Sequence, residues 1–268
     1  MALSGLGWAM DVTENAGLAF LLTLIAGLST GIGSAIAYFI RKPRIVYLSF
    51  SLGLSAGVMI YVSFMELLPV ALETVSEAWG LAVFFAGIAA IALIDWSVPS
   101  PENPHNYEGL DEPTAPRHDS SLMRTGLLTA LAIGIHNFPE GLATFASTLS
   151  DVRVGVFIAV AIAIHNIPEG IAVSVPIFYA TSNKNKAFTY SFLSGISEPV
   201  GAGVGYLILL PFLTPAVLAG LLAFIAGIMI YVSLDELLPL AHRYGHGHLV
   251  IVGIVTGMLI MAISLLLM

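Results

Sequence analysis

The chain has 268 residues, of which 57% are hydrophobic and 10% are charged, and its formal net charge is -8. A soluble domain carries about a quarter charged residues to cover its surface, so this composition excludes a soluble fold and favours helices that meet lipid. The absence of cysteine excludes disulfides and thiolate metal ligands. We therefore expect residues 1–268 to form one all-α integral membrane domain.

Eight apolar segments follow one another, and each is long enough to cross the hydrocarbon core of a bilayer. Breaks rich in Pro, Gly, Asn and basic residues separate them, as expected of turns. The predicted transmembrane helices cover residues 14–40, 45–72, 77–97, 122–149, 153–180, 186–211, 214–241 and 246–268. The one longer connection, a flexible cytoplasmic loop at about 98–121, contains His105 and His118, so either a solvated linker or a metal-collecting loop fits it.

The basic residues predict the orientation, because cytoplasmic loops of membrane proteins are enriched in Lys and Arg. Eight of the nine basic residues fall in connections on one predicted side, and only Arg153 falls on the other. An even number of spans returns the chain to the side on which it started. We therefore expect both termini to lie outside the cytoplasm.

Two pairs of segments repeat one another. GVMIYVSFMELLPVA at 57–71 and GIMIYVSLDELLPLA at 227–241 are identical at eleven of fifteen positions. HNFPEGLA begins at His136, and HNIPEGIA begins at His165 on the next predicted helix. Because the partners cross in opposite directions, the eight helices form a 3+2+3 inverted-repeat arrangement. Inverted repeats are typical of transporters, whose binding site lies near the midplane.

Acidic residues without basic partners lie inside the predicted helices, and no Lys or Arg lies in the middle of any of them. A charge at the bilayer centre costs at least about 2.5 kcal/mol, so these groups need protons or a bound cation. This pattern is typical of a cation site. The intramembrane acids are Glu66, Glu140, Glu169, Glu198, Asp235 and Glu236.

The paired HNxPEG motifs give the strongest chemical signal. In each motif the His and the Glu are four residues apart and share a helical face, with the Asn beside them. Imidazole, amide oxygen and carboxylate together suit borderline divalent ions such as zinc, iron, manganese or cobalt. Two inverted copies that face each other predict a binuclear metal site. The candidate ligands are His136, Asn137, Glu140, His165, Asn166 and Glu169.

Glu198 precedes Pro199 in a further predicted helix, and we expect it to be another metal ligand, with a protonated Glu capping the proline kink as the alternative. Other residues keep open roles. Glu66 and Glu236 occupy matching repeat positions, where structural and metal-handling roles fit equally, and Asp235 has Met65 as its counterpart. A metal-receiving cluster and a polar turn both fit His242, His246 and His248.

At HNFPEG, HNIPEG and SEPVGA the chain resembles the ZIP (Zrt-, Irt-like protein) family of metal transporters, especially its bacterial ZupT-type branch. The resemblance covers essentially the whole chain. It implies the ZIP fold, both termini outside the inner (plasma) membrane of a bacterium, and an elevator-type motion of spans one, four, five and six. It also implies zinc as the main substrate, with iron, manganese, cobalt or cadmium beside it. It maps the binuclear centre to His136, Asn137, Glu140, His165, Asn166, Glu169 and Glu198, and it suggests a homodimer.

Two other functions compete with metal import. An intramembrane metal-dependent hydrolase would use the same His and Glu residues, but catalytic zinc sites usually have three protein ligands and one open position. A proton- or sodium-coupled antiporter would explain the carboxylates and leave the paired His–Asn unexplained. We therefore expect a transporter of divalent metal ions that is not an enzyme and has no resident cofactor. Its partners are the metal ions and the lipid bilayer, and nucleic acid is not among them.

Overall fold

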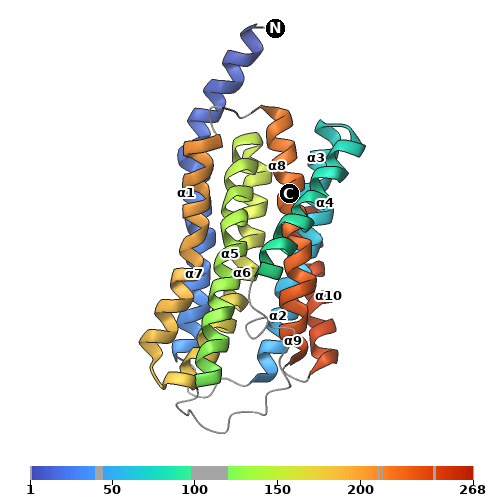
Figure 1. The fold of residues 1–268 in the computed structure, drawn as a ribbon. Helices are drawn as coiled ribbons and strands as arrows, with labels where there is room; N and C mark the ends of the chain where they lie inside the picture. Colours follow the sequence, from blue (N-terminus) through green and yellow to red (C-terminus); the bar gives the residue numbers. More distant parts are fainter. Residues whose placement is uncertain are drawn as a thin grey trace.

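The computed structural model describes residues 2–39, 45–97, 120–209, 212, 214–243 and 246–267. Every regular element in these ranges is helical, and the elements join into eight helical rods that lie side by side (Figure 1). The predicted all-α fold with eight helices is confirmed. The rods are α1 (Ala2–Phe39), α2–η1–α3 (Ile45–Val62, Ser63–Leu67, Leu68–Thr74), α4 (Glu77–Ser97), α5 (Ser120–Ser150), α6 (Val152–Thr181), α7–η4 (Lys184–Val204, Gly205–Leu209), α8–η6–α9 (Pro215–Val232, Ser233–Leu237, Leu238–Arg243) and α10 (Gly247–Leu266).

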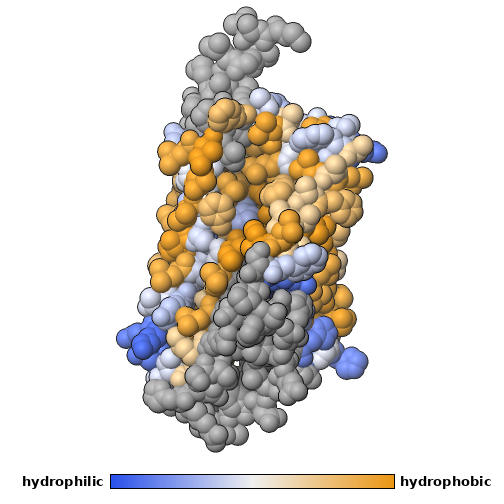
Figure 2. Space-filling model, viewed as in Figure 1, coloured by the Kyte–Doolittle hydropathy of each residue, from blue (hydrophilic) through white to orange (hydrophobic). Residues whose placement is uncertain are grey.

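The helices suit a lipid environment. Six of them are long and apolar enough to cross a membrane by length and composition, among the described residues. The two that fall outside this criterion are α5 and α7, which coincide with predicted spans but carry many hydroxyl, amide and acidic side chains. Apolar side chains cover much of the visible face, and the most hydrophilic ones gather toward its two ends (Figure 2). The protein is therefore an integral membrane protein, and polar side chains of α5 and α7 such as Thr144, Ser191 and Glu198 are buried between its helices.

The described basic residues divide between the two ends of the rods. Arg124 lies in the first turns of α5, Lys184 and Lys186 begin α7, and Arg243 ends α9. Arg153 begins α6 and therefore lies at the opposite end. The other four basic residues, Arg41, Lys42, Arg44 and Arg117, lie outside the described residues. So do residues 98–119 of the predicted loop, which include His105 and His118, whereas α5 already begins at Ser120. Which end faces the cytoplasm stays a prediction.

Glycines bring the helices together within two separate groups. A Cβ added at Gly33 of α1 would lie 2.0 Å from the carbonyl oxygen of Ile167 in α6. A Cβ at Gly57 of α2 would lie 2.2 Å from the carbonyl oxygen of Ile254 in α10. Within the described ranges, every such close approach joins helices of the same group. We call α1, α5, α6 and α7 the four-helix body, and α2–α4 with α8–α10 the framework body.

The two groups meet where α2 packs against α6 and where α8 packs against α5. These two interfaces occupy equivalent places in the inverted repeat, because α2 repeats α8 and the motif of α6 repeats that of α5. The repeat is also visible in the backbone. Single π-helical turns occur at Ser63–Leu67 and Ser233–Leu237, the same positions of the repeated segment. Pro69 and Pro239 follow them and remove the hydrogen bond to a carbonyl within each π turn.

Candidate metal centre

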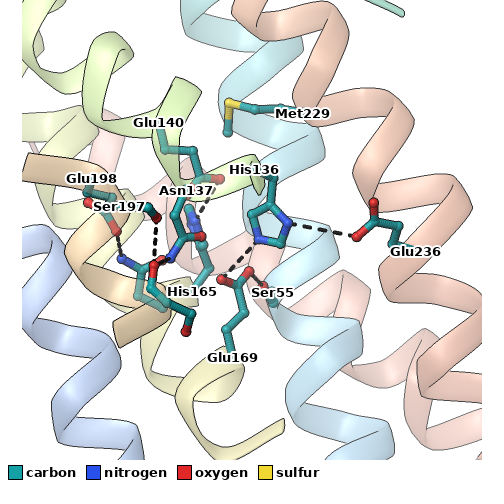
Figure 3. A network of polar contacts seen from close by, with 12 residues as sticks. Ser55, His136, Asn137, Glu140, His165, Glu169, Ser197, Glu198, Met229 and Glu236 are labelled. Atoms are coloured by element: carbon teal, nitrogen blue, oxygen red, sulfur yellow. Dashed lines mark hydrogen bonds and ion pairs between the residues drawn. The ribbon is translucent and has the colours of Figure 1, made fainter. Parts of the chain in front are cut away.

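The seven predicted ligands converge at the centre of the four-helix body, where it faces α2 and α8 (Figure 3). Helix α5 supplies one HNxPEG motif, α6 supplies the other, and α7 supplies Glu198. All seven side chains are at most 1% exposed. The prolines of the motifs lie inside unbroken helices, so each motif keeps its His, Asn and Glu on a helical face. The residues that the sequence singles out are therefore brought together.

The two motifs pair crosswise. The His136 Nε2 atom lies 3.3 Å from the Glu169 Oε2 atom, so the histidine of α5 meets the carboxylate of α6. The His165 Nε2 atom lies 3.2 Å from the Glu140 Oε1 atom, so the reverse pair is also made. This crossed pattern is the one expected of two inverted copies facing each other.

The asparagines link the motifs to α1 and α7. The Asn166 amide donates to the Glu198 Oε1 atom and also, at 2.9 Å, to the carbonyl oxygen of Ala26 in α1. The Asn137 amide donates at 3.4 Å to the carbonyl oxygen of Ser194 in α7. Because the amide nitrogens are used in these bonds, both amide oxygens are left to face other partners. The amides therefore fix the orientation of the site within the four-helix body.

Many polar atoms of the site have no hydrogen-bond partner. A buried polar atom without a partner costs about 1–3 kcal/mol, which makes such a concentration unusual in a folded interior. Most of these atoms are oxygens or imidazole nitrogens, the donor types that bind borderline divalent metals. Six of the seven predicted ligands contribute one: His136 Nδ1, Asn137 Oδ1, Glu140 Oε2, His165 Nδ1, Asn166 Oδ1 and Glu198 Oε2.

The side chains are not arranged as a closed metal cage. Within the part of the chain that the structure describes, no group of three or more His, Asp or Glu residues has the spacing to hold one ion. The physical reason is the crossed pairing, in which each imidazole contacts a carboxylate. A cation would therefore enter by separating these pairs, and the unpaired atoms beside them would complete its coordination.

The framework body also reaches the site. The Ser55 hydroxyl of α2 donates to the Glu169 Oε1 atom at 2.8 Å. The Glu236 Oε2 atom, from η6, lies 3.9 Å from the Nδ1 atom of His136, whose ring is held between two carboxylates (Figure 3). Met229 of α8 points its side chain into the same region (Figure 3). Neither Ser55 nor Met229 stands out in the sequence, because serine and methionine are common in apolar helices.

The residues with open roles lie in different surroundings. Glu66 is partly buried and makes no hydrogen bond or ion pair with the described residues, although it occupies the same repeat position as Glu236. The Tyr231 hydroxyl donates to Asp95 at 3.4 Å, and Asp235 lies in the π turn beside Glu236. Of these acids, Glu236 is the one that contacts His136 in the described structure.

The three histidines near the end of α9 lie on the surface, whereas the predicted ligands are buried. His242, His246 and His248 are all exposed. The Nδ1 atom of His242 lies 2.8 Å from the carbonyl oxygen of Leu238, one turn earlier in its own helix. The structure therefore does not bring this cluster to the predicted site.

Comparison with known proteins identifies the family of this chain. The family model described as "ZIP Zinc transporter" matches residues 97–265. A relative named "Zinc transporter ZupT" from Clostridium perfringens is 53% identical over 96% of this chain and 98% of that protein. Proteins of the same name from Nitratidesulfovibrio vulgaris and Streptococcus mutans are 56% and 54% identical over 94% and 93% of this chain, and over 98% and 97% of their own length. Because the family model covers more than half of the chain and these relatives nearly all of it, the chain belongs to the ZIP family.

Proposed function

We propose that this protein carries zinc across the membrane into the cytoplasm, through the site formed by the two HNxPEG motifs and Glu198. The observation that carries this proposal is the convergence of seven buried His, Asn and Glu side chains, six of which have an atom without a hydrogen-bond partner. The names of the curated relatives support zinc as the substrate. A buried acidic site without a Lys or Arg partner among the described residues favours a divalent cation.

In the proposed site, side chains of both motifs bind the metal ion, which is the transported substrate. His136, Asn137 and Glu140 come from α5, and their counterparts come from α6. Because the carboxylate of each motif contacts the imidazole of the other motif, Glu140 and Glu169 are suited to bridge two ions in a binuclear centre. Iron, manganese, cobalt and cadmium accept the same donor set, so we propose that they share the route with zinc.

We further propose that the four-helix body moves against the framework body in an elevator-type cycle. The glycine contacts within each body hold backbones so close that a methyl group would collide with a carbonyl. Where the two bodies meet, by contrast, the described polar contacts are made by side chains, such as those of Ser55 and Glu236. Side-chain contacts reform after sliding more readily than interlocked backbones do.

The orientation belongs to this proposal as well. With the Lys- and Arg-rich ends of the rods at the cytoplasm, both termini lie outside it, and the membrane is the inner membrane of a bacterium. A homodimer is an expectation from the family resemblance, and it does not alter the site, because all seven ligands come from one chain.

Zinc uptake into proteoliposomes tests the function. The wild type should accumulate radiolabelled zinc, and Glu140→Ala and Glu169→Ala should abolish uptake. The variants Glu140→Gln and Glu169→Gln keep the side-chain shape and should also lose most uptake. Glu73→Ala removes an exposed carboxylate of α3 and should leave uptake unchanged.

Gel filtration and thermal melting establish that each variant is folded. If the wild type binds zinc but moves none across the bilayer under any gradient, the transporter proposal is wrong. The hydrolase hypothesis is then the next to test.

A further inference from the structure

Glu169 differs from the other six candidate ligands in its hydrogen bonding. Both of its carboxylate oxygens have partners, since Oε2 faces His136 and Oε1 accepts the Ser55 hydroxyl. Each of the other six has one buried atom without a hydrogen-bond partner. The extra partner of Glu169 comes from the framework body, whereas the carboxylate itself belongs to the four-helix body. Ser55 and Glu169 are both 0% exposed, so water does not compete for this bond.

The direction of the Ser55 hydroxyl sets it apart from other hydroxyls in these helices. A serine or threonine inside an apolar helix commonly donates to a carbonyl three or four residues earlier in its own helix. Thr23, Ser34 and Ser233 do so here. Ser55 instead donates across the interface to a carboxylate. A hydroxyl that leaves its own backbone for a charged group makes a stronger, orienting hydrogen bond.

The repeat provides an internal comparison. The residue of α8 that corresponds to Ser55 is Ile225, which has no donor to offer the carboxylate of the facing helix α5. In keeping with this, the Glu140 Oε2 atom on that side has no hydrogen-bond partner. The inverted repeat therefore places a hydroxyl donor at only one of the two central carboxylates.

We propose that Ser55 is a positioning residue for the transported metal, which holds the Glu169 carboxylate turned toward the site before the ion arrives. This inference rests on the proposed function. Because the hydroxyl has a single proton and donates it to Oε1, the other oxygen is left facing His136 and the ion. A ligand oriented in advance loses less freedom on binding, and outer partners of metal ligands commonly contribute tenfold or more in affinity.

The test compares variants that differ only in the hydroxyl. Ser55→Thr and Ser55→Val have nearly the same shape, and the first keeps the donor while the second lacks it. Ser55→Ala removes the donor without adding bulk. Ser49→Ala is the matched control, because the Ser49 hydroxyl of the same helix donates to the Ala241 carbonyl within the framework body. Zinc Kd is measured by titration calorimetry on purified protein, and zinc KM and maximal rate are measured in proteoliposomes.

Ser55→Ala and Ser55→Val should raise the Kd and KM for zinc by about tenfold, while the maximal rate stays within about twofold of the wild type. Ser55→Thr should bind at least threefold more tightly than Ser55→Val, and Ser49→Ala should match the wild type. An unchanged zinc Kd in Ser55→Ala would overturn the proposal. A fall in maximal rate without a change in Kd would also overturn it, because Ser55 would then only hold the two bodies together. If the wild type takes up no zinc, transport itself fails, and the Kd series still reports on Ser55.

Discussion

The α2–α6 and α5–α8 interfaces occupy equivalent places in the inverted repeat, yet different side chains cross them. At α2–α6 a neutral hydroxyl, that of Ser55, reaches a carboxylate at 2.8 Å. Where α5 meets the α8–η6–α9 rod, the carboxylate of Glu236 in η6 lies 3.9 Å from the imidazole of His136 in α5. The backbone symmetry extends to the π turns, since both repeats have one at the same position. A repeated sequence and a repeated backbone feature thus coexist with unequal contacts at the predicted ligands.

The difference shows that repeat identity does not predict the surroundings of a residue. Glu66 in MELLP and Glu236 in DELLP occupy the same position of the repeat. Only Glu236 contacts a predicted ligand in the described structure. One carboxylate therefore acts on the site directly in this arrangement, and its repeat partner stands apart. The following predictions test how far this inequality extends.

The largest effect is expected at the paired carboxylates. Glu236→Gln removes a charge beside the buried His136 ring, and we expect the initial rate of zinc uptake to fall at least tenfold. Glu66→Gln changes a carboxylate without such a partner, and we expect a loss of at most about threefold. Initial rates in proteoliposomes at a fixed zinc concentration measure both. Equal losses would mean that the two repeats handle metal equivalently, and the comparison would then be wrong.

A second effect concerns the packing within one body. Gly33→Ala forces a Cβ to within 2.0 Å of the Ile167 carbonyl oxygen, so α1 and α6 must separate. Overpacking of this kind destabilises by about 1–3 kcal/mol, and the melting temperature should fall by several degrees. Gly17→Ala is the control in the same helix, because nothing lies within 4 Å of an added Cβ there. A melting temperature unchanged by Gly33→Ala would contradict the close contact of these helices.

The smallest effect is expected from a covalent link inside the four-helix body. Ser34 of α1 and Ser191 of α7 have hydroxyl oxygens 2.5 Å apart, and the chain has no native cysteine. In the variant Ser34→Cys/Ser191→Cys, an oxidised disulfide should leave zinc uptake within about twofold of the reduced form, since the two helices move together. Uptake before and after oxidation measures this. Strong inhibition reversed by reductant would show that α1 and α7 move relative to each other.

The sequence predicts most of the fold and the ligand positions for clear physical reasons. Apolar length identifies the eight rods, although α1 begins at Ala2 rather than near residue 14. Spacing of four residues places each His and Glu on one helical face, and the inverted repeat turns the two faces toward each other. The crossed pairing of His136 with Glu169 follows from that symmetry.

Other features depend on tertiary contacts that leave no local signal. A π turn contains one more residue than a turn of α-helix. An apolar sequence does not indicate whether this extra residue is present, so the two π turns of the repeat could not be predicted. Ser55 is one serine among several in α2, and only the packing of α2 against α6 directs its hydroxyl to Glu169. The unequal contacts of Glu66 and Glu236 are a property of one arrangement of the two bodies, so a repeated sequence cannot reveal them.

The lack of a Lys or Arg partner at the site, among the described residues, has a consequence for membrane voltage. Glu140, Glu169 and Glu198, when ionised, carry three negative charges, and no described Lys or Arg pairs with them. Moving one charge through 100 mV changes its energy by about 2.3 kcal/mol. In the proposed cycle, the electrically negative cell interior therefore repels the four-helix body once its metal ion has been released. This repulsion drives that body outward, to the side on which it takes up the next ion. The acids that attract the cation would also make the recovery step sensitive to membrane potential.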